Sequence, residues 1–159
     1  MTKPVLVFGY GNLSRGDDAL GVLVLEHIKA HHSLDHISLL TDFQLQIEHA
    51  LDLENRDLVM FVDASVAGEC AFDFCRLRPI RDMSHTMHAM SPSAVLDVYQ
   101  TMYKKTPPPC FLMSIKADRF ELGDALSPKA QHNLQMASLF IDVLLKQPSL
   151  DAWQSKVTL

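Results

Sequence analysis

Two stretches of this chain are apolar almost without interruption, at residues 4–9 and 58–62. A strand with one face in water alternates apolar and polar side chains, whereas a strand covered on both faces does not. The two runs therefore predict central strands of a parallel sheet with helices on both sides. Ligands of such open sheets bind in the crevice outside the carboxyl ends of the strands, so the residues that follow each run become the candidates for function.

The rest of the chain provides further helices and strands for this sheet. Apolar residues at helical spacing, and two Ser-Pro pairs that fit an N-cap followed by proline at the first helical position, mark the helices. We expect helices at residues 18–31 and 44–53, from Ser91-Pro92 and from Ser127-Pro128, and further strands at 37–41, 71–78 and 110–115.

The strand at residues 71–78 follows the preceding strand after only residues 64–70. A parallel crossover needs about a dozen residues or more, so this strand is expected to run antiparallel at an edge. The predicted fold is α/β, a three-layer α/β/α sandwich with a five-stranded mixed sheet and one antiparallel strand. Residues 1–147 would form a single domain, and residues 148–159, after Pro148 ends the last helix, a loosely held tail.

Composition excludes several classes of protein. The net charge of −5 without a basic stripe disfavours nucleic acid as a partner. Three cysteines at irregular spacing suit neither a disulfide framework nor a four-thiolate zinc site. No apolar run reaches the length of a membrane span. The first residues lead directly into a strand, so we expect no signal peptide, no membrane partner and a cytoplasmic location with reduced thiols.

The loop after the first run, Gly9-x-Gly11-x-x-Ser14, resembles a dinucleotide-binding fingerprint. Its third glycine is missing, and Asp17 and Asp18 at the helix start would repel a pyrophosphate. We therefore expect no nucleotide cofactor. Acidic side chains suit a helix N-terminus, so these two residues could also be helix caps with no other role.

A further acid and a histidine fall at the same predicted edge. Asp63 follows the 58–62 run, and His88 lies just before a helix start. With an acid from the glycine loop they would form an O,O,N set suited to a divalent transition metal. The alternative for Asp63 is a turn-forming role without chemistry.

The motifs together resemble those of the hydrogenase maturation endopeptidases. They are G-x-G-N-L-x-x-G-D-D-x-x-G at residues 9–21, V-D-A at 62–64 and a histidine ahead of a helix, in that order along residues 4 to about 145. The resemblance implies a five-stranded sheet with one antiparallel strand and a monomer. It implies an enzyme that removes the C-terminal extension of the nickel-loaded large-subunit precursor of a nickel-iron hydrogenase.

Matching residue to residue, the resemblance implies that Asp18, Asp63 and His88 are the metal-binding and catalytic residues, with nickel carried by the substrate. His85 is the alternative histidine. Asp17 is an alternative acid, and Asp42, which ends the second strand, would orient a ligand from behind. Many members of the family have glycines after the acid that ends the second strand, whereas this chain has none directly after Asp42. This difference would reshape the rim of the cleft.

No activated nucleophile is apparent in the sequence. Cys75 and Cys110 lie in apolar strand patterns, where a buried thiol is inert more often than catalytic. Metal-directed hydrolysis is therefore the predicted mechanism. The same three ligands would also serve a nickel delivery or checkpoint protein without peptidase activity. His31, His32 and His36 form a further histidine tract, which we assign to a helix C-terminus, where cationic side chains suit the dipole.

Overall fold

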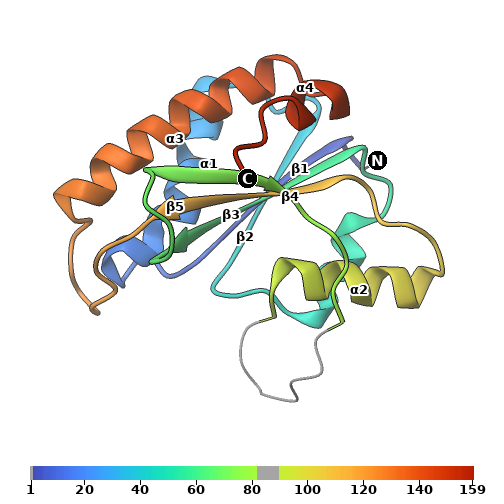
Figure 1. Ribbon diagram of the computed structural model, residues 1–159, viewed down its shortest axis with the longest axis horizontal. Helices are drawn as coiled ribbons and strands as arrows, with labels where there is room; N and C mark the ends of the chain where they lie inside the picture. Colours follow the sequence, from blue (N-terminus) through green and yellow to red (C-terminus); the bar gives the residue numbers. More distant parts are fainter. Residues whose placement is uncertain (1, 82–89) are drawn as a thin grey trace.

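The computed structural model describes residues 2–81 and 90–159, and its centre is a five-stranded sheet of order β2-β1-β3-β5-β4 (Figure 1). The strands are β1 (Val5–Tyr10), β2 (Ile37–Asp42), β3 (Leu58–Ser65), β4 (Phe72–Arg76) and β5 (Cys110–Lys116). Strands β1, β2, β3 and β5 are parallel, and β4 pairs antiparallel with β5 at the edge. The expected mixed sheet with one antiparallel strand is confirmed.

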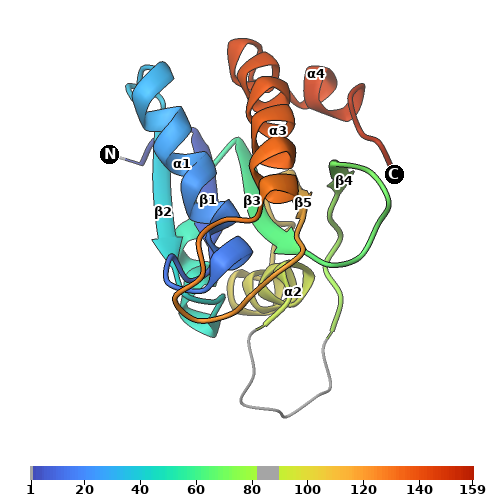
Figure 2. The same cartoon turned by 90° about the vertical axis from the view of Figure 1, so that its left-hand side faces the viewer.

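Helices cover both faces of the sheet, which confirms the three-layer arrangement (Figure 2). One face carries α1 (Leu20–His31), α3 (Pro128–Lys146) and the short α4 (Leu150–Gln154), and the other carries α2 (Pro92–Tyr103) and the 3-10 segment η2 (Ile47–Leu53). Ser91 and Ser127 cap α2 and α3 as expected, each accepting a backbone N–H three residues on. Within residues 2–81 and 90–159, no helix has both the length and the apolar character needed to cross a membrane.

Strand β1 shows why the apolar runs lack alternation. Val5 and Val7 point into the core beneath α1 and α3, whereas Leu6 and Phe8 point into the core beneath α2 and η2. All four side chains are buried. Burial of each such side chain contributes roughly 1.5–3 kcal/mol, so the hydrophobic effect favours this two-sided covering strongly.

Two glycines let α1 approach the sheet closely. A Cβ atom on Gly9 would lie 2.3 Å from the carbonyl oxygen of Gly21, and one on Gly21 would lie 2.6 Å from the carbonyl oxygen of Val62. Any larger residue would push the helix away from β1 and β3. The start of α1, and the loop that leads to it, are thereby fixed against the carboxyl ends of these strands.

Strand β3 is longer than the apolar run indicated. It continues past Val62 to Ser65, and Asp63 pairs with Ser114 of β5. The alternative of a turn-forming Asp63 is therefore wrong, because its backbone belongs to the sheet. The segment expected as a helix at residues 44–53 is the shorter 3-10 segment η2, and the antiparallel strand ends at Arg76, two residues before the expected boundary.

The last dozen residues were expected to be a loosely held tail, and the structure contradicts this. Ser149 caps the short helix α4, whose Trp153 is fully buried and donates its indole N–H to the carbonyl of Leu144 at 2.9 Å. Beyond α4, the backbone N–H of Thr158 donates to the carbonyl of Phe74 at 2.7 Å. Pro148 ends α3 as expected. The segment after it is nevertheless held in place, because Trp153 packs against the apolar surface beside β4 and β5.

We expect Trp153→Ala to destabilise the protein by about 3–5 kcal/mol, because it removes a fully buried indole and leaves a cavity. Urea unfolding followed by far-UV circular dichroism measures this loss. Lys156→Ala, an exposed position in the same segment, serves as the control and should change stability by less than about 0.5 kcal/mol. A loss below about 1 kcal/mol for Trp153→Ala would mean that the segment is loosely held after all.

Candidate active site

Gly11 turns the chain away from the end of β1. Its φ is +144°, and a Cβ atom there would lie 2.0 Å from the carbonyl oxygen of Asp18, so only glycine fits. The loop then folds back, and the backbone N–H of Asn12 donates to Oδ2 of Asp18 at 2.9 Å. The half-buried carboxylate of Asp18 is thereby held at the carboxyl edge of the sheet.

Asp63 reaches the same edge from β3. Burial raises the pKa of its carboxyl to about 6, and the nearby charge of Asp18 adds to the rise, although hydrogen bonds from the Tyr10 hydroxyl and the Ala64 N–H act against it. Burial and the charge of Asp63 in turn raise the pKa of Tyr10. Asp18 thus lies near enough for its charge to raise the pKa of Asp63, and the shared ligand role of the two residues stays a prediction.

This carboxylate pair has the electrostatics of a cation site. Among residues 2–81 and 90–159, neither Asp18 nor Asp63 forms an ion pair with a basic side chain. Burial chiefly, and the charge of Asp18 in addition, disfavour the ionised form of Asp63. A divalent cation relieves that repulsion, so the donors at this edge fit a metal ion.

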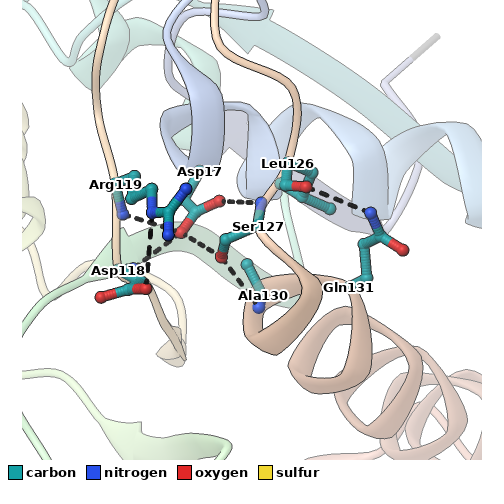
Figure 3. A network of polar contacts seen from close by, with 7 residues as sticks. All are labelled: Asp17, Asp118, Arg119, Leu126, Ser127, Ala130 and Gln131. Atoms are coloured by element: carbon teal, nitrogen blue, oxygen red, sulfur yellow. Dashed lines mark hydrogen bonds and ion pairs between the residues drawn. The ribbon is translucent and has the colours of Figure 1, made fainter.

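Asp17, the alternative acid, has a different role (Figure 3). Its fully buried carboxylate accepts the backbone N–H groups of Asp118, Arg119 and Ser127 at 2.7–2.9 Å, together with the Ser127 hydroxyl at 2.8 Å. Burial opposes ionisation, but these donors outweigh it and hold the pKa of Asp17 below its ordinary value. Both oxygens of Asp17 are occupied, so it is not available as a metal ligand.

The interpretation of the two acids as helix caps is also wrong. A short 3-10 turn, η1 (Gly16–Ala19), precedes α1, and no side chain caps either element. Asp18 bonds back to Asn12, and Asp17 bonds across to the loop between β5 and α3. Asp17 therefore ties two chain segments together, whereas Asp18 remains at the edge of the sheet.

Asp42 orients a histidine of η2. The backbone N–H of Gln46 donates to Nδ1 of His49 at 2.8 Å, so Nε2 carries the ring proton and donates to Oδ2 of Asp42 at 3.1 Å. Oδ1 of Asp42 accepts the N–H of Phe43 at 2.7 Å. In the part of the chain that the structure describes, Asp42 bonds to neither Asp18 nor Asp63, and its contacts order the rim of the site.

His88 and His85 lie outside the described residues, so their ligand roles stay predictions. The first described residue after them is Met90, whose N–H donates to the carbonyl of Leu45 at 3.2 Å. Ser91 follows as the cap of α2.

An open groove of about 630 Å³ runs beside Asp18, between the carboxyl ends of β1 and β2. Its rim carries three largely exposed apolar side chains, Leu13, Phe43 and Leu122. The lining residues are Gly11, Asn12, Leu13, Ser14, Val22, Thr41, Asp42, Phe43 and Leu122. The groove is open to solvent and partly apolar, as a site for a polypeptide segment would be.

Sequence reasoning missed the contacts that three residues make with the acids of this region: Tyr10 with Asp63, His49 with Asp42 and Ser127 with Asp17. Tyr10 could have been found, because parallel β1 and β3 in register bring alternate residues of both strands to the same face. His49 and Ser127 left no such signal, because their partners Asp42 and Asp17 come from other segments of the chain.

We expect Asp17→Asn to destabilise the protein by about 3 kcal/mol. The side-chain NH2 of asparagine would face the four groups that now donate hydrogen bonds to the carboxylate, and the buried negative charge would be lost. Urea unfolding at neutral pH measures the effect. Asp118→Asn changes an exposed carboxylate of the same loop and is the matched control. Equal stability of the two variants would show that the buried carboxylate does not hold the loop.

The raised pKa of Asp63 predicts a pH-dependent stability of the metal-free protein. The unfolded chain loses this proton near the ordinary pKa of 3.8, and the folded chain keeps it until about 6. The contribution is therefore complete below about pH 4 and is lost as pH rises through 6, on the order of 2–3 kcal/mol. Urea unfolding in a chelator across this range should show a shallower decline for Asp63→Asn than for the exposed control Asp151→Asn. Parallel curves would contradict the assignment.

Compared by sequence, the chain matches no protein-family model and no curated protein. Compared by structure, it is similar to a [NiFe] hydrogenase maturation protease HycI from Thermococcus kodakarensis KOD1, with 23% identity, a TM-score of 0.67 and coverage of 92% of this chain and 94% of that one.

Two structures from Escherichia coli are similar to the same degree. The hydrogenase maturating endopeptidase HybD has 22% identity and a TM-score of 0.69, over 89% of this chain and 92% of that one. A protein described as an endopeptidase has 20% identity and a TM-score of 0.71, over 91% and 93%. The fold expected from the sequence motifs is thus confirmed: this chain has the fold of the hydrogenase maturation proteases.

Proposed function

We propose that this protein is an endopeptidase that removes the C-terminal extension of the nickel-loaded large-subunit precursor of a nickel-iron hydrogenase. The observation that carries the proposal is the largely buried carboxyl of Asp63, whose pKa the nearby charge of Asp18 helps to raise. Among residues 2–81 and 90–159, neither acid forms an ion pair with a basic side chain. The shared fold and the order of the sequence motifs support the same substrate. As the sequence suggested, we take the enzyme to be a cytoplasmic monomer.

In this proposal the nickel ion belongs to the substrate and is the feature that the site recognises. Asp18 and Asp63 contribute carboxylate oxygens, and His88, retained from the sequence motifs, contributes an imidazole nitrogen. Contact with a cation favours the ionised form of Asp63, so binding would release its proton at slightly acidic pH. A precursor without nickel would instead meet two neighbouring carboxylates and bind poorly.

The groove beside Asp18 would hold the polypeptide on one side of the scissile bond. The exposed side chains of Leu13, Phe43 and Leu122 offer apolar contacts along its rim. Asp42 and His49 order the same rim through their hydrogen bond. Binding the metal and the peptide at once would fix the scissile carbonyl against the carboxylate pair, which is the positional contribution that hydrolysis requires.

The two cysteines of the sheet, Cys75 in β4 and Cys110 in β5, do not compete as nucleophiles. Burial raises the pKa of Cys110 and of Cys75, so both thiols stay protonated near neutral pH. We take the attacking reagent to be water, which adds across the amide bond of the extension while the carboxylate edge and the substrate's metal polarise the reacting groups.

The decisive experiment mixes the purified protein with nickel-loaded and with nickel-free precursor and follows the large subunit by intact mass spectrometry. We expect truncation of the nickel-loaded precursor alone. Asp63→Asn and Asp18→Asn, which keep shape and remove charge, should slow truncation at least about 100-fold, or about 2.7 kcal/mol in activation free energy. The exposed Asp151→Asn is the control and should cleave at the normal rate.

The same assay separates the alternatives. His88→Ala and His85→Ala, compared side by side, identify the histidine that acts. Equal cleavage of both precursors would remove the metal-directed step from the proposal. Stoichiometric transfer of nickel without any loss of mass from the subunit would contradict peptidase activity and establish a delivery or checkpoint role.

A further inference from the structure

A second cluster of potential metal ligands lies between α1 and α3. Nε2 of His27 and Nε2 of His32 lie 2.8 Å and 2.6 Å from the same oxygen, Oδ1 of Asp142. All three ligand atoms lie within 4.8 Å of one another. His27 lies in the second half of α1 and His32 just after its last residue, whereas Asp18 precedes its first turn, so at least two helical turns, about 10 Å, separate the cluster from the candidate active site.

The convergence of the two imidazoles depends on how α1 ends. Residues five apart on a continuous helix point in different directions, because each residue advances the helix by about 100°. Helix α1 ends at His31, and His32 is extended, with φ −131° and ψ 150°, which redirects its side chain toward α3. The ring of His31 stacks on that of His27 with centroids 4.3 Å apart and restrains it.

We propose that His27, His32 and Asp142 form a binding site for a divalent transition-metal ion of the Zn²⁺ type, joining the end of α1 to α3. Two imidazole nitrogens and one carboxylate oxygen are a common ligand set for such ions, with a fourth position left for water. Metal–ligand bonds of about 2.0–2.2 Å place tetrahedral ligands roughly 3.3 Å apart. The atoms here need small side-chain rotations to reach that spacing.

The electrostatics and the exposure of the cluster suit an ion arriving from solvent. The three side chains are 14–25% exposed, so they are neither sealed nor freely mobile. Partial burial opposes ionisation of Asp142, but hydrogen bonds from His32 and His27 hold its pKa below the ordinary value, and the carboxylate is charged near neutral pH. Each Nε2 faces Oδ1 of Asp142 as a hydrogen-bond donor, so an arriving cation would displace that proton or shift it to Nδ1, and the freed lone pair would then bind the metal.

The test is a calorimetric titration with Zn²⁺ alone, using the full chain with Asp18→Asn, Asp63→Asn and His88→Ala to remove the candidate active site. We expect one equivalent of Zn²⁺ to bind. His32→Ala and Asp142→Asn, added singly, should weaken that binding at least 10-fold. His36→Ala and His132→Ala, at exposed positions outside the cluster, are the controls and should leave the affinity unchanged.

Because a variant at the α1–α3 contact could disturb folding, a second measurement uses the unaltered cluster. In the same background, Zn²⁺ should shift the imidazole nuclear magnetic resonance signals of His27 and His32 and leave those of His36 and His132 in place. Unchanged signals of His27 and His32 at saturating Zn²⁺, or equal affinity in the His32→Ala and control variants, would overturn the proposal. These outcomes are independent of precursor cleavage, so failure of one proposal leaves the other standing.

Discussion

The close contact between the start of α1 and strands β1 and β3 determines where the functional groups of this protein lie. It exists only because Gly9 and Gly21 have no side chains, and a Cβ atom on either would collide with a backbone carbonyl. Gly11 then allows the loop to fold back over the strand ends. The position of Asp18 follows from these three steric requirements more than from any attraction.

The adjacent acids Asp17 and Asp18 have different roles because their surroundings differ. Asp17 lies among four donors from the β5–α3 loop, which keep it ionised and buried as a structural anion. Asp18 lies at the edge beside Asp63, where the two charges oppose each other. The first arrangement stabilises the fold, whereas the second stores an unfavourable interaction that a cation relieves. That difference is what makes the edge, and not the loop as a whole, a candidate site.

Helix α1 links two regions of different chemistry. Its N-terminal side adjoins the paired carboxylates and the groove, and its C-terminal end carries the histidines that face Asp142 of α3. The two regions use different ligand atoms and lie toward opposite ends of α1. A ligand at the histidine end would fix the helix whose other end positions Asp18, although the regions share no residue.

The sequence by itself determined the layered sheet and its single antiparallel strand, because hydrophobic periodicity and chain length between strands are local or additive properties. It also singled out Asp18 and Asp63 as candidates, because both follow apolar strands of the predicted sheet. The resemblance favoured Asp18 over Asp17, but the sequence could not reveal the structural role of Asp17, since the donors that surround its carboxylate come from residues about a hundred positions away. The sequence also did not predict that the C-terminal segment is packed against the domain. Pro148 indicates where α3 ends, but the surface that buries Trp153 is formed by other segments of the chain. Only the tertiary structure decides such matters, because hydrogen bonds and packing between distant segments depend on where the whole chain places them.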